Sequence, residues 1–355
     1  AELTRAWLSA KIRAQMRGYG MVAASQGLFG LGLAFALALG ALLYRDGSLS
    51  IGAVFLVFRY TEMLRQPTEQ IRNEVQDLQQ AGASLGRVER LLGQQSRLAD
   101  GPRDALPPGP LALALDRVWF GYEPGAPVLR GITLHLPPRR VLGIVGRTGS
   151  GKTTLTRLVP RFYDPDDGVV RLGGVDLRTV SAAAIRARVG LVTQVAHLFN
   201  ASVRDNLTLF DDEVPDARLV DVLESVGMAP WLRGLPAGLD TRLGAGGSGL
   251  SAGQTQILAC ARLLLRDPDV VILDEPSSKL DPATERLVHR AFARLLAGRT
   301  GIVVAHRLST FALADDILVL ERGETLEYGP RLALAADPDS RYAGLLRLAA
   351  EEVVA

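Results

Sequence analysis

One glycine-rich segment constrains this chain more than any other feature. The run Gly-Arg-Thr-Gly-Ser-Gly-Lys-Thr occupies residues 146–153 and follows the apolar run at 141–145. It satisfies the pattern G-x-x-x-x-G-K-[ST], a phosphate-binding loop that connects a buried strand to a helix. Its glycines let backbone N–H groups approach an anion, and the helix N-terminus adds partial positive charge. The predicted nucleotide ligands are Gly146, Arg147, Thr148, Gly149, Ser150, Gly151, Lys152, Thr153 and Thr154.

The loop and a second acidic site together predict chemistry on a nucleoside triphosphate. Lys152 is expected to reach the β- and γ-phosphates, and the Thr153 hydroxyl to coordinate Mg²⁺. A second apolar run, 270–273, ends in Asp274 and Glu275. The aspartate can hold Mg²⁺, and the glutamate can act as general base toward the attacking water. An ordinary strand end would explain the acidic pair alone, but its position downstream of a phosphate loop favours a catalytic role.

Residues 249–254, Gly-Leu-Ser-Ala-Gly-Gln, precede a predicted helix and resemble the signature sequence of ATP-binding cassette (ABC) proteins. Other segments resemble that family's motifs in the same order. The resemblance covers essentially all of 111–345. It implies an α/β P-loop NTPase fold, with a mostly parallel sheet and a helical insertion. The matching residues outside the phosphate loop and the signature are Tyr122, Gln194, Ser278, Lys279, Leu280, Asp281 and His306.

The resemblance to ABC proteins also implies a role for each match. Tyr122 would stack on adenine, with Phe120 as the competing aromatic residue. Gln194 would reach Mg²⁺ or the attacking water, and His306 would hydrogen-bond the γ-phosphate. The implied cofactors are ATP and Mg²⁺, with Thr153, Gln194 and Asp274 as metal ligands. The implied catalytic residues are Glu275, His306 and Gln194.

The same resemblance implies a partner subunit. Ser251, Gly253 and Gln254 would contact the ATP of a facing ABC subunit, identical or different, so that ATP joins two such domains. Two residues depart from the family pattern. Ala252 stands where the signature usually has glycine, and Ala245 stands where exporters usually have glutamate. The second departure puts the usual contact with membrane helices in doubt, whereas the predicted Glu275 and His306 favour retained hydrolysis.

The N-terminal part of the chain is patterned for a membrane. The run 21–44 has only Ser25 and Gln26 as polar interruptions and is long enough to cross a bilayer as a helix. A buried helix of a soluble protein is the alternative. A weaker apolar stretch at 49–64, broken by Arg59 and Glu62, continues into a polar helix ending near Leu92. We therefore predict spans at about 19–44 and 49–64 within a partial transmembrane domain, 1–92.

Flanking arginines predict the orientation of these spans. Basic residues precede the first span and follow the second, whereas the connecting turn holds only Arg45, so both long ends are expected in the cytosol. The expected location is the cell membrane, multi-pass, with lipid around the spans. Residues 93–110, rich in Pro, Gly and charge, predict a linker to the ATP-binding domain, 111–355. The single cysteine, Cys260, fits a reducing cytosol.

Residues 1–92 resemble the last part of the membrane domain of ABC exporters. That resemblance implies the C-terminal portion of a half-transporter lacking four spans, with a short two-span protein as the alternative. It leaves the transported substrate unknown. The balance of 40 basic and 38 acidic residues gives no indication of a nucleic-acid partner. A soluble ABC ATPase and a catalytically silent nucleotide-binding module are the rival functions.

Overall fold

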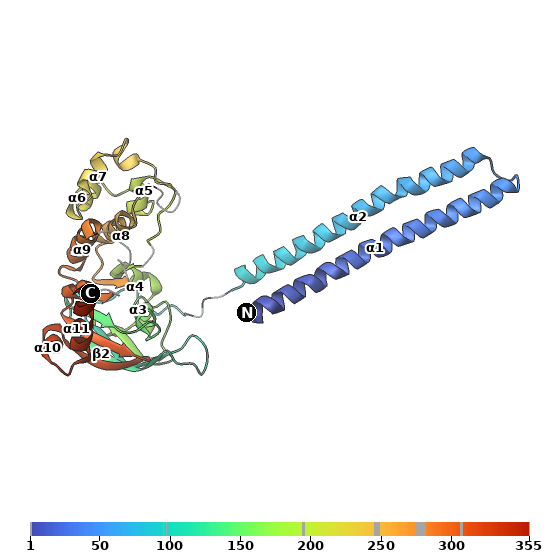
Figure 1. Cartoon of the computed structure of the whole chain (residues 1–355). Coiled ribbons are helices and arrows are strands. Elements are labelled where there is room, and N and C mark those ends of the chain that lie inside the picture. The colour runs from blue at the N-terminus through green and yellow to red at the C-terminus, as the bar shows by residue number, and fades with distance from the viewer. Residues whose placement is uncertain are drawn as a thin grey trace. The chain divides into compact units, whose positions relative to one another are not determined.

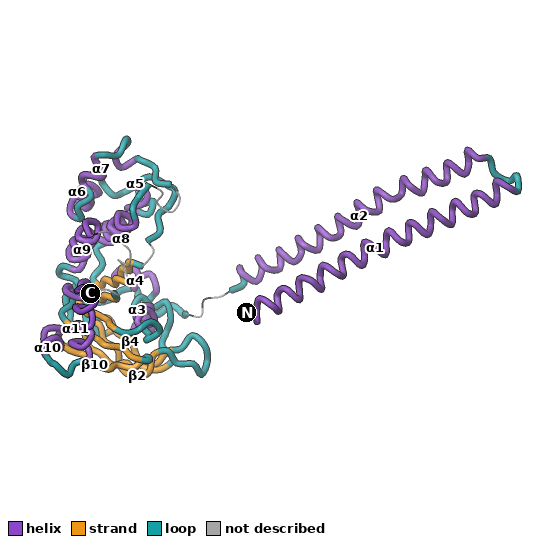
Figure 2. Tube along the Cα trace, viewed as in Figure 1, coloured by secondary structure: helices purple, strands orange, loops and turns teal. Residues whose placement is uncertain are grey.

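The computed structural model describes residues 2–94, 96, 98–193, 196–244, 249–274, 282–305 and 308–354. The chain forms two compact units, Ala1–Ser96 and Arg97–Ala355. The first unit is a pair of helices and the second contains all of the strands (Figure 2).

The first unit is a helical hairpin (Figure 1). Helix α1 spans Glu2–Arg45, and helix α2 spans Ile51–Leu92. Ser50 starts α2 as its N-cap, because its side chain accepts a hydrogen bond from the Ala53 N–H at 3.2 Å. The helices approach closely at Gly40, where an added Cβ would lie 2.9 Å from Val54 Cγ1. A small residue at this position therefore permits the packing.

The apolar half of α1 has the properties of a membrane span. Val22–Arg45 is 24 residues long; its most apolar stretch has a mean hydropathy of 2.0, and only 6% of that stretch is buried. Core helices of soluble proteins bury such a surface, so this exposed apolar surface favours a lipid environment. Among the described residues this is the one helix long and apolar enough to span a bilayer. The predicted span at 49–64 lies almost entirely in α2, which is less apolar over such a length, so this span stays a prediction.

The second unit contains a four-stranded antiparallel sheet that the sequence did not predict as a separate layer. The strand order is β2-β1-β4-β5. Strand β1 has a register shift between Leu115 and Val118. Arg117 lies in that irregularity with a φ of 47°. The strands are β1 Leu113–Phe120, β2 Leu129–Leu136, β4 Asp167–Leu172 and β5 Val175–Asp176.

A six-stranded sheet carries the predicted phosphate loop, and its order is β10-β9-β3-β8-β7-β6. Every neighbouring pair from β9 to β6 is parallel, and β10 joins β9 antiparallel. The prediction of a mostly parallel sheet is confirmed. The strands are β3 Val141–Val145, β6 Val189–Val192, β7 Val270–Asp274, β8 Thr300–Val304, β9 Asp316–Glu321 and β10 Glu324–Pro330.

Helices of the second unit fall into two groups. Those from α5 to α8 form the predicted helical insertion between β6 and β7, and Figure 1 shows α5, α6 and α7 gathered at one end of the unit. The others accompany the sheets. Their bounds are α3 Lys152–Leu158, α4 Ala182–Arg188, α5 Val203–Thr208, α6 Asp216–Ser225, α7 Ala229–Arg233, α8 Ala252–Arg266, α9 Pro282–Leu296, α10 Arg331–Ala336 and α11 Arg341–Val354.

The second unit begins earlier than the predicted boundary at residue 111. Leu106, within the predicted linker 93–110, is only 5% exposed. The Gly109 carbonyl accepts a hydrogen bond from Arg188 Nη2 at 2.9 Å. Most of the predicted linker is therefore docked chain that belongs to the second unit. Proline, glycine and charge mark segments without helix or strand, but they do not distinguish a free segment from a docked one.

Cys260 lies on α8 and is fully buried. Burial raises the pKa of its thiol far above the ordinary value. We expect iodoacetamide at pH 8 to leave Cys260 unmodified in the folded protein and to alkylate it in denaturant, because the thiolate is the reactive form. Mass spectrometry of the two samples checks this, and rapid alkylation without denaturant would contradict the buried position.

Candidate nucleotide-binding site

Parallel pairing brings the predicted catalytic segments to one edge of the six-stranded sheet. Ile144 on β3 pairs with Val304 on β8, and Val304 pairs with Asp274 at the end of β7. The phosphate loop follows β3 directly, so the loop and Asp274 leave the sheet at the same edge. Carboxyl ends of parallel strands are where α/β folds place their ligands. Segments more than a hundred residues apart in the sequence therefore converge, as the phosphate-loop pattern requires.

The backbone of the phosphate loop has the conformation that its glycines permit. Gly149 and Gly151 have φ values of 81° and 105°, in the left-handed region that favours glycine. Gly151 is also the N-cap of α3, and its helix start carries no side-chain cap. The first N–H groups of α3 thus have no capping side chain of their own, and an anion is the usual alternative partner.

Lys152 is held inside the phosphate loop. Its side chain is only 6% exposed, and its ammonium donates to the carbonyls of Gly146 at 2.7 Å and Arg147 at 3.0 Å. A buried ammonium requires such partners because its desolvation is costly. The charge is thereby fixed beside the loop's N–H groups. This geometry provides a preorganised cation at the position where the loop pattern predicts the β- and γ-phosphates.

The end of β9 and the turn that joins it to β10 contact the phosphate loop, and this contact was not predicted from the sequence. An added Cβ at Gly146 would lie 2.4 Å from the Leu320 carbonyl oxygen. The Gly323 N–H donates to the Ser150 carbonyl at 3.1 Å, and Gly323 has a φ of 83°. A cavity of about 610 Å³ opens between the loop and α11, lined by Arg147, Phe311, Leu345 and other residues. The glycine at 323 was the available sequence signal.

Aromatic side chains form a cluster next to α3. The Tyr122 ring lies 5.1 Å from Phe120 and 5.3 Å from Tyr163, both measured between ring centroids. Phe120 is 4% exposed and Tyr122 is 45% exposed, so Tyr122 is the ring of the two competing candidates that can receive a base. Its hydroxyl shares a hydrogen bond with Thr154 Oγ1 at 3.3 Å and accepts another from Arg157 Nη1 at 3.3 Å. The cluster therefore holds an aromatic face near the phosphate loop.

Replacing Tyr122 tests base stacking. We expect Tyr122→Ala to weaken ATP binding by about 1–3 kcal/mol, roughly 5- to 150-fold, because an aromatic platform contributes that much per stacked base. Tyr122→Phe keeps the ring and loses only the hydrogen bonds of the hydroxyl, so it should bind nearly normally. Calorimetric titration with ATP checks both variants. Weak binding in Tyr163→Ala with normal binding in Tyr122→Ala would assign stacking to the other ring.

The signature segment starts α8 with a capping box. The Ser251 hydroxyl accepts from the Gln254 N–H at 3.2 Å, and the Gln254 side chain accepts from the Ser251 N–H at 2.9 Å. Ser251 and Ala252 are exposed, whereas Gly253 is buried. The Ser251 hydroxyl keeps its own proton to donate. An exposed hydroxyl at a helix start suits an outside anion.

A polar pair within the insertion, Asn206 on α5 and Arg262 on α8, was not predicted from the sequence. Asn206, only 1% exposed, donates from its amide to the Phe199 and Ser202 carbonyls at 3.0 Å each. Arg262 on α8 donates to the Asn206 carbonyl, to its side-chain oxygen at 2.9 Å and to the His197 carbonyl at 2.7 Å. Burial lowers the pKa of the Arg262 guanidinium. The pair fixes segment 197–202, shortly after Gln194, to the signature helix.

Several predicted site residues lie outside the described residues: Gln194, Ala245, Glu275, Ser278, Lys279, Leu280, Asp281 and His306. Their places in the sequence follow described strand ends: Gln194 follows β6, Glu275 follows β7, and His306 follows β8 and Ala305. Within the described residues, no cluster of three or more His, Cys, Asp or Glu side chains has the arrangement of a metal site. A hydroxyl from Thr153 and a carboxylate from Asp274 are oxygen donors of the kind that Mg²⁺ prefers.

Comparison with known proteins supports the reading of these motifs. Residues 129–278 match the ABC transporter domain family. The chain is 38% identical over 314 residues to the toxin RTX-I translocation ATP-binding protein of Actinobacillus pleuropneumoniae, covering 88% of this chain and 44% of that protein. It is 40% identical over 300 residues to a multidrug efflux ATP-binding/permease protein of Mycobacterium tuberculosis, covering 84% of this chain and 25% of that protein.

A solved structure extends the likeness to the helical hairpin. The structure of a bacterial Atm1-family ABC exporter with ATP bound superposes with a TM-score of 0.69 and 31% identity, covering 98% of this chain and 61% of that chain. The chain thus spans less than half the length of the two curated relatives above and under two thirds of the solved exporter. Family match, relatives and fold agree, and the chain contains a domain of the ABC transporter family.

Proposed function

We propose that this chain binds and hydrolyses Mg-ATP and that hydrolysis drives export by a membrane domain to which α1 and α2 belong. The observation that carries the proposal is the convergence of the phosphate loop, buried Lys152 and Asp274 at one edge of the sheet. An exposed apolar helix in the same chain opposes a soluble ABC ATPase. The complete phosphate-loop pattern and the acidic pair at 274–275 argue against a catalytically silent nucleotide-binding module.

Each residue of the site would have one task. The loop N–H groups and Lys152 would bind the phosphates, and Tyr122 would stack on adenine. Thr153, Asp274 and Gln194 would hold Mg²⁺, which supplies charge neutralisation at the transferred phosphate. Glu275 would accept a proton from the attacking water while His306 contacts the γ-phosphate.

A second ABC subunit would complete the site. The exposed helix start at Ser251 suits a phosphate that another subunit presents, with Gly253 and Gln254 beside it. ATP would then join two such domains, and hydrolysis would release them. Lipid would surround the helical hairpin in the cell membrane, with the ATP-binding domain in the cytosol.

Phosphate release by the purified chain in lipid nanodiscs tests the proposal. In nanodiscs we expect phosphate release from ATP to require Mg²⁺. In detergent, where chains can separate, we expect the rate of release per chain to rise with protein concentration, because two chains form each site. Chelation of Mg²⁺ should abolish the activity. A rate per chain that is independent of concentration would refute the two-subunit site, and undetectable release would refute hydrolysis.

A further inference from the structure

We propose that Arg161 is a positioning residue that clasps the segment after the membrane helices onto the phosphate-binding helix, so that the two move as one body. We call Arg161 together with residues 99–103 the linker clasp. The linker clasp lies entirely within the second unit. Its use in transport rests on the proposed function, whereas its existence does not.

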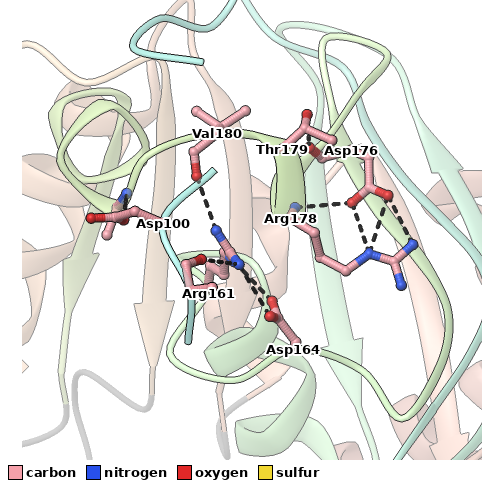
Figure 3. Close-up of polar contacts among 9 residues, drawn as sticks. Asp100, Arg161, Asp164, Asp176, Arg178, Thr179 and Val180 are labelled. Carbon is pink, nitrogen blue, oxygen red and sulfur yellow. Dashed lines mark hydrogen bonds and ion pairs between the residues drawn. The ribbon is translucent and has the colours of Figure 1, made fainter. Parts of the chain in front are cut away.

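Arg161 is a buried cation with nearly all of its donors engaged (Figure 3). Its side chain is 4% exposed. It donates to both carboxylate oxygens of Asp164 at 2.8 and 3.1 Å, to the Val180 carbonyl at 2.9 Å and to the Ala99 carbonyl at 2.9 Å. Four of the five guanidinium N–H groups are therefore used. Lysine could not reproduce this planar fork.

The position of Arg161 ties the clasp to the phosphate loop. Helix α3 starts at Lys152 and ends at Leu158, whose carbonyl accepts from the Arg161 N–H at 3.1 Å. Arg161 has a φ of 54°, a left-handed conformation that is unfavourable for a side chain of this size. Such a conformation persists where surrounding contacts fix it. The buried α3 therefore connects the phosphate site at one end with the guanidinium at the other.

The backbone of the linker also forms hydrogen bonds with residues 179–181, which lie just before α4. The Arg103 N–H donates to the Thr179 carbonyl at 3.0 Å, and the Ser181 N–H donates to the Arg103 carbonyl at 2.8 Å. Gly101 lies so close to this segment that an added Cβ would be 2.1 Å from the Thr179 carbonyl carbon. Only glycine fits there, so the docked path depends on that residue.

A third contact joins the linker to the start of α4. An Asp100 carboxylate oxygen accepts from the Ala182 N–H at 2.8 Å, as Figure 3 shows at the edge of the cluster. Helix α4 leads directly into β6, and Gln194 follows β6. The segment that leaves α2 at Gly93 thus contacts both the end of the phosphate-binding helix and the element that leads to Gln194. If nucleotide binding displaced α3 or α4, residues 99–103 would therefore be displaced with it.

Hydrogen exchange of the whole chain in nanodiscs tests the clasp with three variants. Arg161→Gln removes the guanidinium, Gly101→Ala blocks the docked path sterically, and Asp100→Ala removes only the contact to Ala182. We expect exchange at the amides of Arg103, Ser181 and Ala182 to rise at least about tenfold in the first two variants. Asp100→Ala should affect mainly Ala182. The matched control is Arg178→Gln, which breaks the ion pair with Asp176 in the same segment; the described side-chain hydrogen bonds of Arg178 go to Asp176.

The nucleotide response separates positioning from mere packing. In the wild type, Mg-ATP should slow exchange in peptides covering 146–158 and also alter it in the last turns of α2, 80–92. Gly101→Ala should keep the first effect and lose the second. Unchanged exchange at 98–104 in both Arg161→Gln and Gly101→Ala, or an α2 response that survives in them, would overturn the clasp. If Mg-ATP left amide exchange in 146–158 unchanged in the wild type and in every variant, the proposed function would be overturned instead. The linker clasp would then be judged only by whether exchange at 98–104 differs between the variants and the wild type.

Discussion

Replacing Lys152 by alanine is expected to reduce Mg-ATP-dependent phosphate release by at least about a hundredfold, the usual loss when one preorganised charge donor to the reacting group is removed. The ammonium is buried and held within the loop by the Gly146 and Arg147 carbonyls, so its charge is fixed in position before ATP binds. Phosphate release and ATP binding by the purified variant measure the effect.

The chain offers a matched control for Lys152→Ala because lysine is so rare in it. Lys11→Ala makes the same substitution in α1, where the ammonium lies over the exposed Trp7 ring, and should leave hydrolysis unchanged. Melting curves of both variants identify any loss of folding. Near-normal phosphate release in a folded Lys152→Ala variant would remove this lysine from the proposed site.

The second large effect is expected for Glu275→Gln, which should retain ATP but slow its hydrolysis by about 10²- to 10⁴-fold, the usual contribution of a general base. Glutamine has the same shape but cannot accept the proton of the attacking water. ATP should therefore remain bound for much longer than one normal turnover. Retention of radiolabelled ATP after gel filtration, compared with phosphate release, measures both properties.

A neighbouring substitution distinguishes the base from a metal ligand. Asp274→Asn, at the end of β7, should raise the Mg²⁺ concentration that hydrolysis requires, because a carboxylate ligand is lost. Excess Mg²⁺ should partly restore Asp274→Asn but not Glu275→Gln. Unchanged turnover in Glu275→Gln would refute the assigned base, whatever the metal dependence.

Most of the candidate site could be predicted from the sequence because its signals are local. The phosphate loop occupies one contiguous stretch, and the apolar run before it, the glycines within it and Lys152 after them are each recognisable without knowledge of the fold. The same holds for the capping box at Ser251 and Gln254, which involves residues three apart. The apolar run within α1 is likewise a contiguous signal, whereas the second apolar stretch is interrupted by charge.

The supporting residues could not be predicted, because their partners are distant in the sequence. Gly323 contacts the phosphate loop through Ser150, and Arg262 holds Asn206 from another helix. The antiparallel sheet pairs Leu113 with Leu172, and no local periodicity specifies such a partner. Long-range pairing depends on which surfaces are buried together, and a single sequence does not state that.

The sequence by itself determined that this chain has a phosphate-binding loop, an acidic pair after a buried strand and an apolar helix near its N-terminus. Those features are set by short-range rules of backbone conformation and hydropathy. Only the tertiary structure decided that residues 98–110 are docked rather than free, and that the cation behind this docking is Arg161. Its partners Ala99, Asp164 and Val180 become neighbours only when the chain folds, because a buried guanidinium must find acceptors wherever the fold supplies them.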